Sequence, residues 1–266
     1  MYDLHVHSNF SIDSKSSMED MTLAAMEKNL KTICFADRIV LDFTVNKINL
    51  SFRTEDYLRN INQVKYKYLK EIEILTGLEI GMQPHLGGSY DAIIDKYPLD
   101  YIIMSVHSVD GKDIFIDDFL QDIDQSHALY LYYQQVYQCL EAYDNFDVLG
   151  LFDGVDRYLG NKNLSSIYQD HFPRIRDILS LLISKGKGLE VNSSALRFGL
   201  DYFHPKQAIL ELYREQGGEI ITLGSSANSP EYIGHSYRQM ERLLKELGFK
   251  YFYIYRDRKK IPINIS

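Results

Sequence analysis

The chain opens with Met1-Tyr-Asp-Leu-His-Val-His-Ser-Asn-Phe10, and this stretch predicts how the rest is arranged. Leu4 and Val6 alternate with His5 and His7, which is typical of a β-strand carrying both imidazoles on one face. Their Cα atoms would lie ~6.6 Å apart, so both rings can reach one divalent ion. A polar pair on a wet strand face is the alternative. Because an N-terminal strand is usually buried in a fold of this size, the two histidines need a partner there, which favours a metal site.

Downstream, short apolar runs alternate with helix-like segments. We expect helices over residues 17–28, 54–70, 90–97, 126–143, 173–185, 205–215 and 236–247. We expect strands over residues 32–37, 73–81, 100–107, 147–151, 188–192 and 219–224, a last apolar run over 251–255, and a loop over 39–53. Such alternation with short connections calls for parallel strands and right-handed crossovers. Seven or so units of this length predict a closed α/β barrel similar to a TIM barrel, in a single domain over residues 1–266.

Polar side chains fall at the C-terminal ends of the expected strands, where barrels carry their chemistry. These residues are His5, His7, Asp37, Glu79, His107, Asn192 and Ser225. We expect them to converge on one cavity at the mouth of the barrel.

Composition narrows the classes of function. The 266 residues are 45% hydrophobic and 25% charged, which is typical of a globular enzyme, and the net charge of −8 argues against nucleic-acid binding. The one dense basic run, 256–260, is expected to be a solvated end. No apolar run approaches ~18 residues and no leader precedes Asp3, so we expect neither membrane spanning nor secretion. Cys34 and Cys139 are interpreted as core thiols of a reducing, cytoplasmic compartment. The sequence does not indicate an oligomeric state.

Several motifs resemble the polymerase and histidinol phosphatase (PHP) family, and within it the histidinol-phosphatase branch. They are Asp3-Leu-His-Val-His-Ser8, Gly77-Leu-Glu79-Ile-Gly81 with Gln83-Pro-His85-Leu86, Ser105-Val-His107, and Leu189-Glu-Val-Asn192 with Leu196-Arg197. The resemblance runs almost end to end. It implies a distorted seven-stranded barrel, two or three ions of zinc, iron or manganese, a small-molecule substrate, and hydrolysis of phosphate monoesters by a metal-activated water.

Four positions depart from the family pattern. Arg38, Leu151 and Asn228 stand where the family has histidine ligands, and Ser226 stands where it has an aspartate ligand. The resemblance leaves five metal ligands in place: His5, His7, Glu79, His107 and Asp13.

The remaining ligands favour one ion. A first ion would keep His5, His7 and Glu79, which can hold zinc with water in the fourth place. A second would keep Glu79 and His107 alone. A third would keep Asp13 and face Arg38, whose guanidinium repels a dication 4 Å away by about 8 kcal/mol at an effective dielectric of ~20. We therefore expect at most one divalent ion, or none, and a native activity that is lost or weak.

Natural decay and deliberate redesign both explain the lost ligands, and we favour redesign. Leu151, flanked by Phe152, together with Val40 and Ala195, indicates a pocket recast for an apolar molecule. In this alternative an engineered barrel binds or converts such a molecule without the metal cluster. Ser105 with His107 would supply a nucleophile and base, and Asp37 a general base. A simpler interpretation is that the histidines are leftover ligands.

The resemblance also implies substrate contacts. Arg157 and Arg197 correspond to phosphate contacts of the branch, with surface ion pairs as the alternative, and Arg38 and Ser225 are further candidates. We expect Arg38 to enter the mouth and pair with Asp13, Asp37 or Glu79, because a buried unpaired cation costs several kcal/mol. Of Leu151 and Phe152, neighbours on an expected strand, only Leu151 should point inward. Four other histidines are interpreted as structural: His127, His171, His204 and His235.

Overall fold

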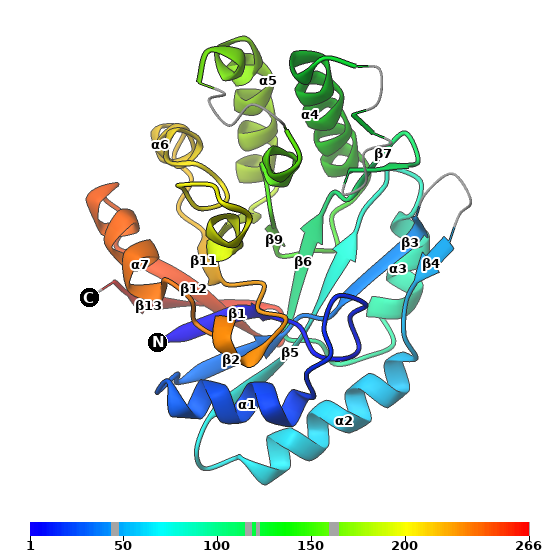
Figure 1. Cartoon of the computed structure of the whole chain (residues 1–266), viewed down its shortest axis with the longest axis vertical. Coiled ribbons are helices and arrows are strands. Elements are labelled where there is room, and N and C mark those ends of the chain that lie inside the picture. The colour runs from blue at the N-terminus through cyan, green and yellow to red at the C-terminus, as the bar shows by residue number, and fades with distance from the viewer. Residues whose placement is uncertain (44–47, 115–118, 121–122, 160–164, 266) are drawn as a thin grey trace.

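Parallel strands form the centre of the molecule, and helices surround them (Figure 1). In this computed structural model the described residues are 1–43, 48–114, 119–120, 123–159 and 165–265. Seven strands pair in parallel, each with the next: β1 (Tyr2–Val6), β2 (Thr32–Phe35), β5 (Glu73–Gly81), β6 (Tyr101–Ser105), β9 (Val148–Leu149), β10 (Gly188–Asn192) and β11 (Ile221–Gly224). The backbone N–H of His7 donates to the carbonyl of Ala227 at 2.8 Å, which joins the first strand to the segment after the last. The predicted distorted seven-stranded barrel is confirmed.

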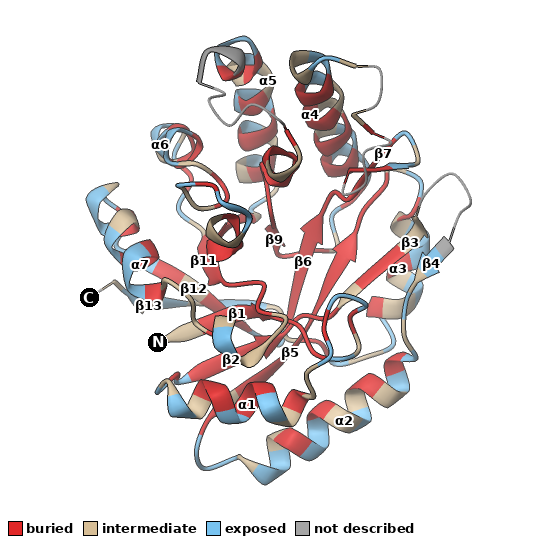
Figure 2. Cartoon of the chain, in the orientation of Figure 1, coloured by how far each residue is buried: buried red, intermediate tan, exposed pale blue. Residues whose placement is uncertain are grey.

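In the described part of the chain, seven α-helices cover the outside of this barrel, with their buried faces toward the strands (Figure 2). They are α1 (Met18–Glu27), α2 (Thr54–Lys67), α3 (Gly87–Ile94), α4 (Gln125–Ala142), α5 (Ser165–Ser184), α6 (Gln207–Glu215) and α7 (Tyr237–Glu246). Ser17 caps α1 in a reciprocal pair with Asp20, as its sequence predicts. The helix expected over residues 54–70 begins at Thr54, and its N-cap is Arg53, which makes no side-chain capping hydrogen bond. Short 3-10 helices η1 (Gly154–Arg157), η2 (Ser193–Phe198) and η3 (Pro230–Tyr232) lie after β9, β10 and β11.

The loop expected over residues 39–53 is wrong. Residues 38–43 form β3 (Arg38–Phe43), which pairs with β4 (Ile48–Leu50); residues 44–47 lie outside the described part. The cause is the length of β5: β2 pairs with its first half and β3 with its second half. This register places Arg38 directly opposite Glu79.

The helix expected over residues 173–185 begins earlier. Helix α5 starts at Ser165 and contains Pro173 in its interior. Proline is favoured in the first turn of a helix, and that preference misplaced the expected start.

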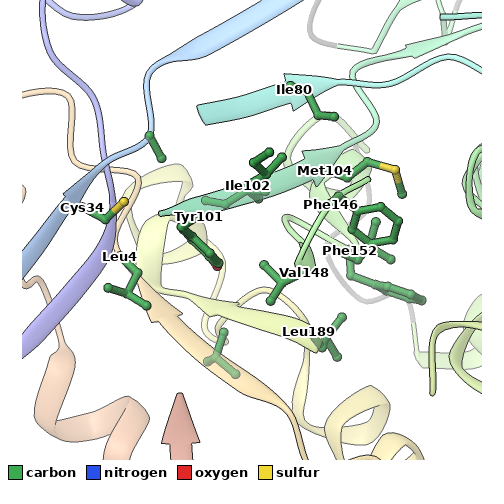
Figure 3. Packing of buried hydrophobic residues seen from close by; sticks show 14 of the residues in the cluster. Leu4, Cys34, Ile80, Tyr101, Ile102, Met104, Phe146, Val148, Phe152 and Leu189 are labelled. Carbon is green, nitrogen blue, oxygen red and sulfur yellow. The ribbon is translucent and has the colours of Figure 1, made fainter. Parts of the chain in front are cut away.

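Apolar side chains from successive strands fill the core. Figure 3 shows Leu4, Cys34, Tyr101, Val148 and Leu189, which come from five different strands, packed together. Cys34 and Cys139 are both buried and free, as expected of core thiols. No helix among the described residues is long and apolar enough to cross a bilayer.

Besides β3 with β4, the described residues form two further antiparallel hairpins: β7 (Ser108–Val109) with β8 (Lys112–Asp113), and β12 (Tyr251–Arg256) with β13 (Lys259–Asn264). The turn of the second hairpin holds the basic run 256–260, which is exposed apart from the half-buried Arg258, as expected of a solvated end. Within this run, Arg256 Nε lies 2.5 Å from Glu73 and Arg258 Nε lies 2.6 Å from Asp147. These acids lie at the starts of β5 and β9, so the turn anchors at the end of the barrel opposite the strand C-termini.

Candidate active site

Three buried side chains converge at the C-terminal ends of β1 and β5. The Nε2 atoms of His5 and His7 are 3.0 Å apart, and Glu79 Oε2 lies 3.4 and 3.3 Å from them. All three residues are fully buried. They are the one group of this kind that could hold a metal among the residues the structure describes.

The spacing of these atoms fits a tetrahedral ion. Ligand atoms on bonds of ~2.0–2.2 Å at tetrahedral angles are separated by roughly 3.3–3.6 Å, close to the 3.0–3.4 Å seen here. The donor set of two imidazoles and one carboxylate suits zinc, iron or manganese. The predicted first ligand set is thus assembled, with room for one ion.

Glu190 is a site residue that the sequence interpretation missed. It lies inside β10, and its Oε1 accepts from His5 Nδ1 at 2.7 Å. Burial opposes protonation of His5, but the carboxylates of Glu190 and Glu79 outweigh it and raise the pKa of His5 to about 10. A fully buried acid within the apolar run Gly188–Asn192 was the available signal, because such a group needs a charged partner.

Asp13 and Arg38 flank the three ligands. Asp13 Oδ1 lies 3.2 Å from His7 Nδ1. Arg38 pairs with two acids: its Nε lies 2.6 Å from Glu79 Oε2, and its Nη1 lies 3.8 Å from Asp13 Oδ2. Arg38 therefore enters the mouth and pairs as expected. Burial raises the pKa of Glu79, but Arg38, His5 and His107 outweigh it and hold that pKa well below its usual range.

His107 belongs to the same cluster, whereas Ser105 does not pair with it. His107 Nε2 lies 3.1 Å from Glu79 Oε1. Ser105 Oγ is buried and has no hydrogen-bond partner among the described atoms. The structure therefore gives no hydrogen-bonded Ser105–His107 pair.

Asp37 and Ser225 are placed in supporting contacts. The Asp37 carboxylate accepts hydrogen bonds from the backbone N–H and hydroxyl groups of Ser8 and Ser11, at 2.6–3.1 Å. Ser225 donates its hydroxyl to Asp3 at 2.5 Å. Both side chains hold the loops that follow strands.

Arg157 is fixed by a chain of buried groups. Its Nε donates to His204 Nε2 at 2.9 Å, and His204 Nδ1 lies 2.6 Å from Asp153 Oδ1. The guanidinium stacks over Phe198, 4.4 Å from the ring centroid. Burial, reinforced by Arg38 and Arg197, lowers the pKa of Arg157 to about 10. No carboxylate in the described part of the chain lies within ion-pair distance of Arg157, so the expected alternative of a surface ion pair does not describe it.

The same network gives His204 a defined structural role, because it links Asp153 to Arg157. The other three histidines interpreted as structural have different partners: His127 stacks on Tyr130, His171 meets Ser126, and His235 meets Ser236.

Three side chains near the end of β11 connect neighbouring loops. They are Arg197, expected to contact phosphate, and Ser226 and Asn228, expected to stand in place of metal ligands. Arg197 donates to the carbonyls of Ser225 and Ser226 at 3.0 and 2.7 Å and to Asn228 Oδ1 at 3.2 Å. Ser226 Oγ accepts from Asn192 at 2.8 Å, and Asn228 donates to the carbonyl of Asp13 at 3.0 Å.

We expected Leu151 and Phe152 to be neighbours on a strand, with only Leu151 pointing inward, but the strand ends before both residues. Strand β9 stops at Leu149, and Leu151 has a left-handed φ of 47°. Both side chains are buried, and Phe152 stacks on Tyr133 of α4 at 5.6 Å. The two residues therefore do not alternate as neighbours on a strand would.

Fold and site together define a barrel of the phosphoesterase class. Residues 3–194 match the PHP domain, so the chain belongs to the PHP family. It is 26% identical over 250 residues to a probable histidinol-phosphatase of Clostridium acetobutylicum, covering 94% of this chain and 95% of that one. A histidinol-phosphatase of Lactococcus lactis is 27% identical over 261 residues, covering 93% and 91%.

Solved structures agree. The Lactococcus lactis histidinol phosphate phosphatase, solved with zinc, L-histidinol and phosphate, superposes with a TM-score of 0.89 at 26% identity over 98% of both chains. A putative histidinol phosphatase from Listeria monocytogenes, at 19% identity and a TM-score of 0.77, shares the fold. None of these relatives supports the expectations that activity is lost or that the barrel was redesigned.

Proposed function

We propose that the chain hydrolyses phosphate monoesters with one divalent ion held by His5, His7 and Glu79. The convergence of their three ligand atoms carries this proposal. A bound zinc, iron or manganese ion would lower the pKa of a coordinated water and so supply the nucleophile. Arg38 Nε lies 2.6 Å from Glu79 Oε2, and its positive charge would repel a further ion beside this carboxylate, which favours a single ion over a cluster.

Arg157 is the principal phosphate ligand in this proposal. A mostly buried guanidinium that is fixed by His204 and Ser194, with no carboxylate partner among the residues the structure describes, is suited to an anion. Arg197 and Arg38 add positive charge nearby, and the charge of each lowers the pKa of Arg157. Among the candidate acid–base groups, we assign proton transfer to His107, because Ser8 and Ser11 already occupy the Asp37 carboxylate.

Histidinol phosphate is the first substrate to test, because a relative binds histidinol and phosphate. We propose a single domain over residues 1–266 acting on a small molecule in the cytoplasm, where buried free thiols such as Cys34 stay reduced. The alternative of a metal-free Ser105–His107 site lacks the hydrogen bond that would activate the serine.

The test is phosphate release by protein loaded with zinc or manganese. We expect release from phosphate monoesters, its loss on chelation, and its loss in His5→Ala and Glu79→Gln. His127→Ala, on the exposed surface of α4, is the matched control and should keep full activity. Release that survives both chelation and Glu79→Gln would contradict the proposal and favour the metal-free alternative.

A further inference from the structure

An apolar pocket opens beside Arg38 at the edge of the site. Its volume is about 220 Å³, and it is lined by Ile12, Arg38, Val40, Phe43 and Leu50. Val40 and Leu50 are paired across the β3–β4 hairpin, and Ile12 on the loop after β1 is 74% exposed. No carboxylate is among the described lining residues.

This pocket adjoins the ligand cluster through two shared walls. Arg38 lines the pocket and also contacts Glu79 at 2.6 Å. Val40 packs close to His107 because Gly81 lies between them: a Cβ at Gly81 would be 2.8 Å from the Val40 methyl carbons and 3.1 Å from His107 Cδ2. The pocket and the ligand cluster are therefore direct neighbours, separated by the side chains of Arg38 and Val40.

We propose that the pocket binds the alcohol part of the substrate, and that this part is an uncharged apolar or aromatic group. The inference rests on the proposed phosphatase function and names its substrate class. A cavity of ~150 Å³ can hold benzene, so this one accommodates a ring with a short linker. The aliphatic walls favour apolar surface, and the guanidinium of Arg38 can stack on an aromatic face.

The same pocket disfavours a cationic alcohol. An ammonium group placed there would lose its hydration and gain no carboxylate from the lining, whose one charged side chain, Arg38, is itself a cation that already pairs with Glu79 and Asp13. The chain is thus suited to aryl or aralkyl phosphates more than to amino-alcohol phosphates such as histidinol phosphate.

Binding of three phosphonates to the zinc-loaded protein, measured by calorimetry, tests this inference without relying on turnover. Benzylphosphonate should bind about tenfold or more tightly than methylphosphonate, and 2-aminoethylphosphonate more weakly than methylphosphonate. Equal affinities, or tighter binding of the amine, would overturn the inference while leaving the proposed function intact. If none of the three binds and no monoester is hydrolysed, the proposed function fails and the inference with it.

Substitutions locate the preference. Phe43→Ala and Leu50→Ala should each lower the ratio of benzyl- to methylphosphonate affinity toward one. Leu69→Ala, which removes an apolar side chain that is 73% exposed, is the control and should leave that ratio unchanged. Thermal unfolding of each variant checks that it folds. An unchanged ratio in folded Phe43→Ala and Leu50→Ala would overturn the assignment of the pocket.

Discussion

His5 lies between the buried carboxylates of Glu79 and Glu190. These two acids set the protonation state from which His5 would bind an ion. With its pKa raised to about 10 by Glu190 and Glu79 against the effect of burial, the imidazole is protonated at pH 7 when no ion is bound. This shift also stabilises the ion-free protein: the contribution is complete below about pH 6.5 and is lost as pH rises through about 10. A metal needs the neutral imidazole, so binding must displace a proton.

We therefore predict that zinc uptake releases a proton from His5 and that the apparent affinity rises about tenfold per pH unit between pH 7 and 9. Calorimetry in two buffers of different ionisation enthalpy counts the protons. Glu190→Gln should reduce the release by removing one of the two carboxylates that hold the proton. Uptake at pH 7 with no proton release from the native protein would show that His5 is already neutral.

Arg157 is positioned by His204 and, through it, by Asp153. Because His204 Nδ1 faces the Asp153 carboxylate, its Nε2 is left as an acceptor for Arg157. A lost hydrogen bond to a charged group costs about 1.5–3 kcal/mol. We predict that His204→Ala raises KM for phosphate esters about tenfold or more with a smaller effect on kcat, as expected of a positioning residue.

The control for His204 is His171→Ala, another mostly buried histidine, whose contact is with Ser126. It should leave KM unchanged. If His204→Ala instead lowered kcat about tenfold and left KM unchanged, His204 would not act through Arg157.

Sequence motifs identified the residues that we propose as metal ligands, but not those that support them. The alternation of His5 and His7 and the glutamate in Gly77–Gly81 carry local signals. Glu190 and His204 act on partners 185 and 47 residues away in the chain, and no local pattern encodes those pairings.

At the scale of elements, β5 organises the site. Its nine residues pair with β2, β3 and β6, and the register with β3 sets Arg38 against Glu79. The sequence predicted β5 but not β3, because β3 is stabilised by the far half of β5 rather than by its own pattern.

Close packing of β5 against its neighbours predicts the effect of Gly77→Ala. A Cβ at Gly77 would lie 2.7 Å from Cys34 Sγ and 2.9 Å from the carbonyl oxygen of Tyr101. Overpacking of this kind costs about 1–3 kcal/mol in the free energy of unfolding, measurable by urea denaturation. Gly88→Ala, in α3 with nothing within 4 Å of the added carbon, should be neutral or slightly stabilising. Equal stabilities of the two variants would contradict this packing.

At the scale of the whole molecule, the C-terminal hairpin is anchored to the middle of the sequence, at the residues that precede β6 and β9. Arg258 reaches Asp147, which is 7% exposed, and donates from its backbone to the carbonyl of Asp100. The sequence showed the apolar run of β12 but not where the hairpin docks, since its contacts are long-range. Function is segregated accordingly: the anchor lies at one end of the barrel and the ligands at the other.

This separation predicts that Arg258→Met lowers stability without changing metal content. Burial raises the pKa of Asp147 and Arg258 opposes that effect, so removing the arginine leaves a buried acid without its partner, at a cost of about 3 kcal/mol. Arg256→Met breaks a more exposed pair with Glu73 and should cost less than about 1 kcal/mol. Thermal unfolding and elemental analysis of both variants give the two readouts. Loss of metal in Arg258→Met would contradict the separation.

The count of ions per chain tests the central claim most directly. The protein is loaded with zinc and free metal is removed. Inductively coupled plasma mass spectrometry should then find about one zinc ion per native chain and none in Glu79→Gln. The combined variant Arg38→His, Leu151→His, Ser226→Asp and Asn228→His should hold more than one, because it restores the ligands that the PHP resemblance implies. Two or three ions in the native chain, or none, would contradict a single-ion site at His5, His7 and Glu79.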